Sequence, residues 1–178
     1  IPAKYSVRQV LVEHQHFNDA HKCQHILGLL LRSAQQGAIP IINYNDAVSD
    51  SENVKYELRD FKKRNGHVVE CVDNDETASV IASLVKARTL LIMTSAQGIY
   101  KDPLDPSTLI DRITGATIDE VIQNITYAQA NCNGASRQGA NGAKAKLEYI
   151  KEPVMNGTQV IIGSAQYKIS ELLAGTVP

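Results

Sequence analysis

Two short clusters of acidic and amide side chains are the residues of this sequence best suited to chemistry. One is Asn-Tyr-Asn-Asp at residues 43–46, directly after the apolar run 39–42, and the other is Asp-Asn-Asp at 73–75, directly before an apolar helical pattern. A single Asp at such a place usually caps a helix. Three adjacent acid or amide groups exceed that need, and carboxylates so close together repel one another unless a cation separates them. Such clusters can bind an amine, orient a lysine or hold a metal ion.

A third segment has the features of a phosphate-binding loop. Residues 139–142, Gly-Ala-Asn-Gly, run into a helical pattern that carries Lys144 and Lys146. Backbone amides at a glycine-containing loop before a helix favour phosphate, and a lysine there supplies positive charge. The segment is not a Walker A motif. A solvated helix start with its lysines on the outer face is the alternative interpretation.

Histidine and cysteine spacing predicts neither a metal site nor a disulfide framework. His21 and His25 have the i,i+4 spacing that can bind zinc, but no Glu occupies the place that a zincin motif requires. Both lie off the apolar stripe of their helix, which favours a solvated helix face. Three cysteines at unrelated spacings favour reduced thiols and a cytoplasmic setting.

Composition excludes two classes of partner. The chain has 178 residues, enough for one domain with a sizeable core. Its net charge of −1 gives no basic footprint, so nucleic acid is not a favoured partner. No apolar run approaches the roughly 20 residues that a membrane span needs.

Apolar strand patterns alternate with helical patterns along the chain. Strands are expected at 10–12, 39–42, 68–72, 90–93 and 160–162, and helices at 18–36, 77–87, 118–130, 144–151 and 169–173. Asn18 is the expected cap of the first helix, and Gly37 its end. This alternation predicts the α/β class, as a three-layer α/β/α sandwich with a mainly parallel central sheet. The charged segment 49–70 has weak alternation and an Asn-Gly turn signal, so we expect an exposed hairpin or lid there.

The predicted sheet explains why the polar clusters matter. In open α/β sheets, ligands bind beyond the carboxyl ends of the strands. The residues expected beyond such ends are Asn43, Asp46, Asp73, Thr94 and Ser95.

The order of these motifs resembles the amino acid kinase family, most closely its glutamate 5-kinase subfamily. The family's Asn-Glu-Asn-Asp segment after a Val/Ile-Pro-Ile-Ile strand is similar to residues 43–46, and its Gly-Asp-Asn-Asp segment to residues 72–75. Its Leu-Leu-Thr-Asp-x-x-Gly-Leu-Tyr strand and turn are similar to residues 91–100, and its Gly-Thr-Gly-Gly-Met-x-Thr-Lys-Leu loop to residues 139–147. With the strand at 9–12, these matches cover nearly the whole chain in the family's order.

The resemblance implies an activity and its partners. It implies a single amino acid kinase-like domain over residues 1–178 that transfers a phosphoryl group from ATP, with Mg²⁺, to the γ-carboxylate of glutamate in proline biosynthesis. The expected partner is glutamate or a similar small carboxylate, the expected location is the cytoplasm, and the expected assembly is a homo-oligomer. A carboxylate is already a nucleophile, so positioning and electrostatics suffice without a general base.

The resemblance also implies a role for each matched residue. Asp75 would organise the catalytic lysines, and Lys146 would stabilise charge on the transferring phosphoryl group. Substrate binding falls to Asn43, Asp46, Asp73 and Asn74. ATP binding falls to Thr94, Ser95, Tyr100, Gly139, Gly142 and Lys144.

The sequence departs from the family pattern at several positions. Tyr44 stands where the family has an acid, Val72 where it has a glycine, and Ser95 where it has an aspartate, and the loop 139–147 has fewer glycines. Residues 1–8 resemble neither the family's first strand with its lysine nor its glycine-rich loop, so we expect that part to be missing from this chain. The alternatives are a family member acting on another carboxylate or a phosphate substrate, and a non-catalytic regulatory relative that only binds ligands.

Overall fold

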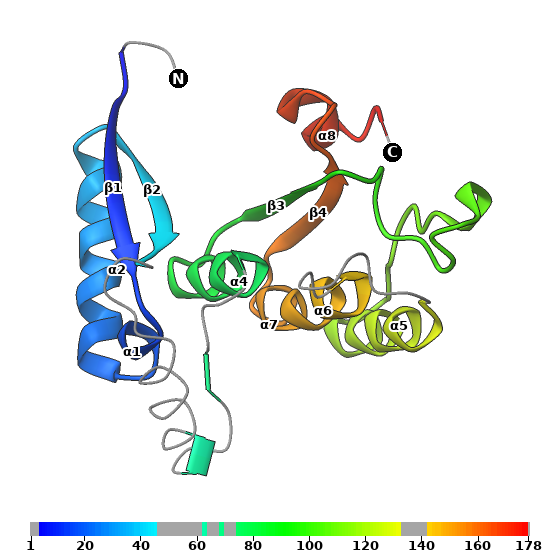
Figure 1. Ribbon diagram of the computed structural model, residues 1–178, viewed down its shortest axis with the longest axis horizontal. Coiled ribbons are helices and arrows are strands. Elements are labelled where there is room, and N and C mark those ends of the chain that lie inside the picture. The colour runs from blue at the N-terminus through cyan, green and yellow to red at the C-terminus, as the bar shows by residue number, and fades with distance from the viewer. Residues whose placement is uncertain (1–3, 46–61, 64–67, 70–73, 133–141, 178) are drawn as a thin grey trace. The chain divides into compact units, whose positions relative to one another are not determined.

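The computed structural model describes residues 4–45, 62–63, 68–69, 74–132 and 142–177 (Figure 1). The chain divides into two compact units, Ile1–Thr77 and Ala78–Pro178. Within these described ranges, each unit forms one two-stranded parallel sheet.

The first unit pairs two strands that flank a long helix. Its elements are β1 (Ser6–Val12), α1 (His14–Phe17), α2 (Ala20–Gln35) and β2 (Ala38–Tyr44). The strands pair in parallel from Ser6↔Ala38 to Val12↔Tyr44. α2 runs beside this pair (Figure 1) and buries Ile26 and Leu30, which share one helix face at i,i+4 spacing.

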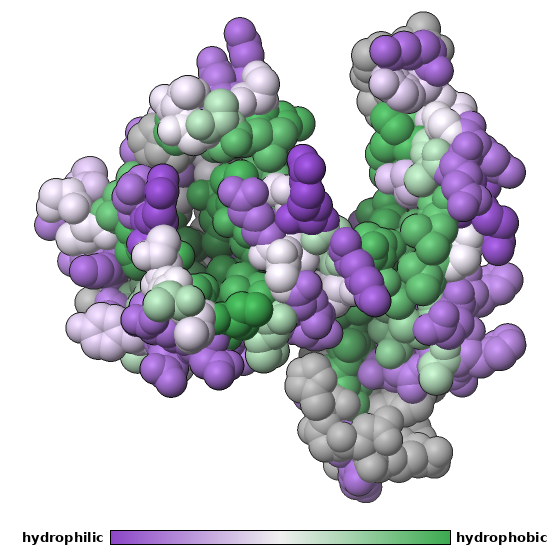
Figure 2. All heavy atoms as spheres, turned by 180° about the vertical axis from the view of Figure 1, so that it is seen from behind, coloured by the Kyte–Doolittle hydropathy of each residue, from purple (hydrophilic) through white to green (hydrophobic). Residues whose placement is uncertain are grey.

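The start of α2 differs from the expected one. Its N-cap is Asp19, not Asn18, because the Asp19 carboxylate accepts a hydrogen bond from the Lys22 backbone N–H at 2.9 Å. Gly37 ends the helix as predicted, with the positive φ of 70° that glycine adopts without strain. His21 and His25 lie on the exposed side of α2, which is hydrophilic at the right of Figure 2. The expectation of a solvated helix face is therefore confirmed.

The second unit packs helices against the other strand pair. Its elements are β3 (Thr89–Thr94), η2 (Pro106–Thr108), α5 (Ile118–Asn131), α6 (Gly142–Tyr149), α7 (Lys151–Met155), β4 (Gln159–Ser164) and α8 (Ile169–Ala174), and α4 (Asn74–Leu84) crosses from the first unit into it. The strands pair in parallel from Thr89↔Gln159 to Thr94↔Ser164.

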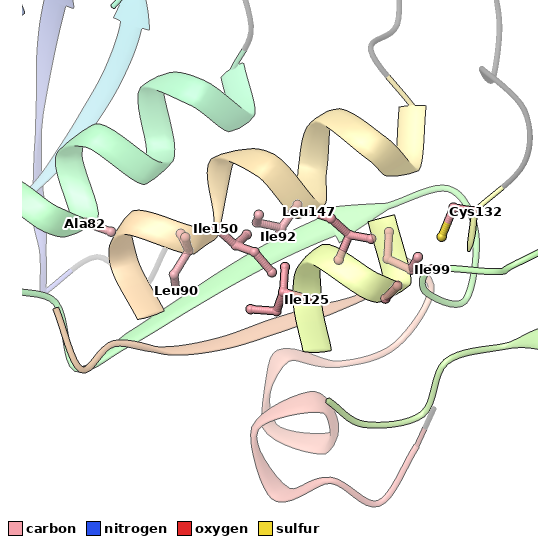
Figure 3. Packing of buried hydrophobic residues seen from close by; sticks show 9 residues of the cluster. Ala82, Leu90, Ile92, Ile99, Ile125, Cys132, Leu147 and Ile150 are labelled. Carbon is pink, nitrogen blue, oxygen red and sulfur yellow. The ribbon is translucent and has the colours of Figure 1, made fainter. Parts of the chain in front are cut away.

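A single apolar cluster forms the core of this unit (Figure 3). Ile125 of α5 and Leu147 of α6 are almost completely buried against Ile92 of β3. The cluster consists of Ala82, Leu90, Ile92, Ile99, Ile125, Ala128, Cys132, Leu147 and Ile150.

The α8 helix approaches β4 closely at one glycine. A Cβ added to Gly163 would lie 2.4 Å from Cδ2 of Leu172, which is itself only 4% exposed. Glycine is therefore required at this position for α8 to lie where it does.

The α/β class with parallel strands is confirmed. The described strands form two two-stranded sheets, and each predicted strand at 10–12, 39–42, 90–93 and 160–162 is longer than its apolar run. The helix expected at 77–87 begins at Asn74, and that expected at 144–151 is two helices, α6 and α7. Of the strand expected at 68–72, residues 68–69 lie outside any helix or strand, and the rest lies outside the described residues. Most of the charged segment 49–70 also lies outside them, although Lys62 and Lys63 are exposed and helical.

Candidate functional site

The carboxyl ends of β1 and β2 bring an acid and an amide together. The Asn45 backbone N–H donates to the Val12 carbonyl at 2.9 Å, which continues the parallel ladder one residue beyond the strands. Glu13 and Asn45 therefore become neighbours. The Asn45 side chain donates from Nδ2 to Oε1 of Glu13 at 2.8 Å.

Asn43 differs from its predicted place. It lies within β2, in register with Leu11, because the ladder extends through Tyr44. Its side chain is exposed and thus accessible to a ligand. Asp46 lies outside the described residues.

Glu13 is a site residue that sequence reasoning missed. Its second oxygen, Oε2, accepts a hydrogen bond from Nε2 of Gln15 at 2.6 Å. The hydrogen bonds from Gln15 and then from Asn45 hold the pKa of the Glu13 carboxyl below its usual value, so Glu13 is a carboxylate at neutral pH. Its position could have indicated this, because Glu13 directly follows the first strand just as Asn45 directly follows the second.

His16 completes the turn that carries Glu13. Burial lowers the pKa of its imidazole, although the nearby carboxylate of Glu13 opposes that shift. The neutral ring can accept a hydrogen bond at Nδ1, and the Glu13 backbone N–H donates to it at 2.8 Å. The His16 backbone N–H donates in return to the Glu13 carbonyl at 2.9 Å.

Asn18 ties the same turn to the segment that precedes the second polar cluster. Its Nδ2 donates to the Val69 carbonyl at 2.8 Å, and its Oδ1 accepts from the Val69 backbone N–H at 3.1 Å. The side-chain amide thus pairs with Val69 as a neighbouring strand would.

The second polar cluster lies at the start of α4. Asn74 is exposed and Asp75 is half-buried in the first helical turn, rather than before the helix as expected. An acid in this turn is favoured by the positive end of the helix dipole. Both residues belong to the same unit as Asn43. Asp73 lies outside the described residues.

The paired ends of β3 and β4 position two of the residues that are predicted to bind ATP. Thr94 closes β3 beside Ser164, and its carbonyl accepts a hydrogen bond from the Ala165 backbone N–H at 2.9 Å. Its hydroxyl accepts from the Ala96 backbone N–H at 3.4 Å. Ser95 is exposed immediately after the strand.

Tyr100 begins a loop whose ends are joined. It bridges to Leu109 in antiparallel fashion, and its phenol donates to Oε1 of Gln97 at 3.3 Å. The Lys101 backbone N–H donates to the Thr108 carbonyl at 3.1 Å. These bonds fix where the chain passes after β3.

The predicted phosphate loop enters α6 at Gly142. This residue is buried and has a φ of +61°, which favours glycine. Lys144 is exposed and Lys146 half-buried on the helix that follows. Gln129 of α5 donates from Nε2 to the Lys144 carbonyl at 2.9 Å and so fixes this helix start. Gly139 lies outside the described residues.

The Cys132 thiol lies within the electrostatic influence of two lysines from separate segments. Burial raises the pKa of the Cys132 thiol, and the positive charges of Lys144 and Lys101 oppose the rise. Lys101 was missed by sequence reasoning, and its place directly after Tyr100 was the available signal. Positive charges of this kind favour a nearby anion such as a phosphate.

The described residues contain neither a cluster of potential metal ligands nor a helix that could span a membrane. Within them, no group of three or more His, Cys, Asp or Glu side chains could hold a metal ion. None of the helices in the described ranges has both the length and the apolar character needed to cross a membrane.

Comparison with known proteins gives one family model and a consistent set of relatives. The model described as the amino acid kinase family matches residues 2–164. Glutamate 5-kinase 1 of Pseudoalteromonas translucida is 28% identical over 172 residues, which cover 96% of this chain and 41% of that protein. Glutamate 5-kinase of Alkaliphilus metalliredigens is 28% identical over 178 residues, covering 98% of this chain and 60% of that protein. Glutamate 5-kinase of Citrifermentans bemidjiense is 29% identical over 173 residues, 95% of this chain and 40% of that protein. The chain therefore spans about half the length of these relatives.

Proposed function

Because the chain belongs to the amino acid kinase family, we propose that it transfers the γ-phosphoryl group of ATP to the γ-carboxylate of glutamate. The product would be glutamyl 5-phosphate. The shared name of the relatives, glutamate 5-kinase, supports this substrate. As parts of the same proposal, the protein would act in proline biosynthesis, in the cytoplasm and as a homo-oligomer.

The observation that carries the proposal is the chemistry at the carboxyl ends of the parallel strands. The end of β1–β2 carries the amides of Asn43 and Asn45, and Glu13 holds the Asn45 amide by a hydrogen bond. Side-chain amides accept from an ammonium group and donate to a carboxylate, so these amides suit an amino acid. The matched positions Asp46, Asp73 and Asn74 would add to the same set.

The second unit would supply the nucleotide half. The end of β3–β4, with Thr94 and Ser95, and the start of α6, with Gly142 and Lys144, correspond to the ATP-binding positions of the family. Lys101 would add its positive charge to that of Lys144, since both act electrostatically on Cys132. Tyr100 and Gly139 complete the proposed ATP-binding set.

The reaction needs no proton transfer. An oxygen of the γ-carboxylate attacks the γ-phosphorus in line, the bond from that phosphorus to the β,γ-bridging oxygen breaks, and ADP leaves with the electron pair. As the family resemblance implies, Lys146 would neutralise charge on the transferring group, and Asp75 would organise the catalytic lysines. Mg²⁺ bound with ATP would supply further neutralisation of the phosphate charges.

A hydroxamate assay tests the proposal. The full chain is incubated with ATP, Mg²⁺, glutamate and hydroxylamine, which traps the acyl phosphate as γ-glutamyl hydroxamate. We expect hydroxamate formation that depends on both ATP and glutamate. Turnover with another carboxylate or with a nucleoside monophosphate, and none with glutamate, would instead assign a different acceptor.

The exposed Ser95 supports a second candidate function, that of a ligand-binding regulatory relative. It stands where the family has an aspartate at the nucleotide edge. Binding of ATP or glutamate by calorimetry without any turnover would favour this alternative over the kinase.

A further inference from the structure

We propose that Glu13 is a positioning residue for the amino-acid site and acts by fixing the side-chain amide of Asn45. The role rests on the proposed function, since it names how one half of that site is held in shape. Asn45 lies two residues after the substrate position Asn43 in sequence and directly before Asp46. A change in the orientation of the Asn45 side chain is therefore expected to alter the binding of glutamate.

The contact between Glu13 and Asn45 has only one possible polarity. A carboxylate oxygen can accept a hydrogen bond but not donate one. Oε1 of Glu13 lies 2.8 Å from the Asn45 amide, so that amide must direct its nitrogen to Glu13. Oδ1 of Asn45 therefore faces away from Glu13 and is the acceptor that this side chain offers on its other side.

The same polarity is enforced from the other side of Glu13. Lys22 of α2 can only donate, and its Nζ lies 2.7 Å from Oε1 of Gln15. Gln15 must then direct Nε2 to Oε2 of Glu13, where the distance is 2.6 Å. Lys22 therefore donates to Gln15, Gln15 donates to Glu13, and Asn45 donates to Glu13 from the other side, so that both hydrogen-bond paths end at this carboxylate.

The turn that carries Glu13 also holds the segment before the second polar cluster. Asn18, five residues after Glu13, makes two of its side-chain amide contacts with Val69, and Val69 lies five residues before Asn74. Asn18 also donates from Nδ2 to the His14 carbonyl at 2.8 Å, which fixes the amide to the α1 turn itself. One short turn thus contacts both segments that carry proposed substrate residues.

Replacing Glu13 by glutamine makes the polarity inconsistent. A glutamine offers one acceptor and one donor group, so its NH₂ would face the nitrogen of either Asn45 or Gln15. Gln15 cannot turn its amide over without placing NH₂ against the Lys22 ammonium. Asn45 must therefore turn over or lose the contact, and either result changes what it presents to the amino acid.

Steady-state kinetics on the full chain test this role. Glu13→Gln should raise the KM for glutamate about tenfold, equivalent to about 1.4 kcal/mol, and leave the KM for ATP unchanged. Glu120→Gln is the matched control, because its carboxylate also accepts a hydrogen bond, from the Ala116 backbone N–H at 2.7 Å, but lies at the start of α5. It should change neither KM. An unchanged KM for glutamate in Glu13→Gln, or equal rises in both KM values, would overturn the positioning role.

A second measurement does not depend on activity. The side-chain ¹H–¹⁵N signals of Asn45, assigned with an Asn45→Ala variant, should shift in Glu13→Gln and stay in place in Glu120→Gln. Signals that do not move in Glu13→Gln would overturn the positioning role alone. Failure of the unaltered protein to form hydroxamate from glutamate would instead overturn the proposed function and, with it, the substrate assigned to this site.

Discussion

Replacing Gly163 by alanine tests how tightly the second unit is built around its nucleotide end. Gly163 lies one residue before the end of β4, where Ser164 pairs with Thr94. The added Cβ would sit 2.4 Å from Cδ2 of Leu172 on α8. Carbon atoms in contact are ordinarily about 3.5–4.0 Å apart, so the overlap exceeds roughly 1 Å.

The cost follows from the lack of free space around Leu172. This side chain is only 4% exposed and cannot move into solvent without losing its own packing. Overpacking of this kind costs about 1–3 kcal/mol. For a chain of this length, each kcal/mol corresponds to a fall of about 2–4 °C in Tm.

Urea unfolding followed by far-UV circular dichroism is a suitable assay, because the chain contains no tryptophan. Gly28→Ala is the matched control. Its Cβ would meet only the guanidinium end of Arg32, with Nη1 at 3.0 Å, and that exposed side chain can move aside. Since Gly28 lies inside α2, alanine there should raise the free energy of unfolding by about 1 kcal/mol.

A double-mutant cycle gives the result that would refute this reasoning. Leu172→Ala alone should cost about 2–5 kcal/mol through the cavity it leaves. In that background Gly163→Ala should cost almost nothing, because the clashing atoms are gone. An equal penalty in both backgrounds would show that the contact with Leu172 is not the cause. No penalty in either would show that α8 does not lie against β4 as described.

Four further changes have expected outcomes. Lys146→Ala should lower turnover strongly and leave calorimetric glutamate binding nearly unchanged, and surviving turnover would remove its catalytic role. Burial raises the pKa of the Cys132 thiol, so the thiol contributes to the free energy of unfolding below its ordinary pKa of about 8.5, and this contribution is lost as pH rises above that value. Cys132→Ala should therefore remove this loss of stability at alkaline pH, as measured by urea titrations. Hydrogen bonds lower the pKa of Glu13, so its carboxylate contributes to the free energy of unfolding above the ordinary pKa of about 4.3, and this contribution is lost as pH falls through the pKa of the folded protein. Glu13→Gln should therefore reduce the loss of stability at acid pH, and an unchanged loss would contradict the assigned pKa shift. Asn18→Asp places a carboxylate oxygen against the Val69 carbonyl and should lower the free energy of unfolding by about 1–3 kcal/mol, whereas no loss would mean that the contact is absent.

Continuous apolar runs, which are typical of parallel strands, predicted four of the strands, although the structure leaves Ile41 of β2 and Met93 of β3 exposed. The runs at 39–42 and 90–93 are the centres of β2 and β3. Their ends were missed because polar residues such as Asn43 and Thr94 also belong to the ladder, and only pairing with the neighbouring strand reveals this.

Long-range contacts explain the errors at helix starts. Asn18 and Asp19 are both good capping residues, and local sequence cannot choose between them. Asp19 became the cap, and the Asn18 amide pairs with Val69, 51 residues away in sequence. The short α1 helix, only four residues, is too brief to show a helical period.

The same limit applies to the candidate site. Glu13 lies 32 residues from Asn45, and only the parallel register of β1 and β2 makes them neighbours. Lys101 and Lys144 likewise act on the same thiol only because of the path that the chain takes after β3. The resemblance supplied the other site residues because it compares whole motifs. The roles of Asp46, Asp73 and Gly139 stay predictions, since they lie outside the described residues.

Transfer of oxygen from glutamate to phosphate tests the proposed reaction most directly. The full chain is given ATP, Mg²⁺, hydroxylamine and glutamate labelled with ¹⁸O in its γ-carboxylate, and the released phosphate is analysed by mass spectrometry. If the γ-carboxylate attacks the γ-phosphorus, hydroxylamine then breaks the bond between carbon and the bridging oxygen, and each phosphate carries one ¹⁸O atom. Unlabelled phosphate would mean that water, not glutamate, attacks the phosphorus, and would contradict the assignment of this chain as a glutamate kinase.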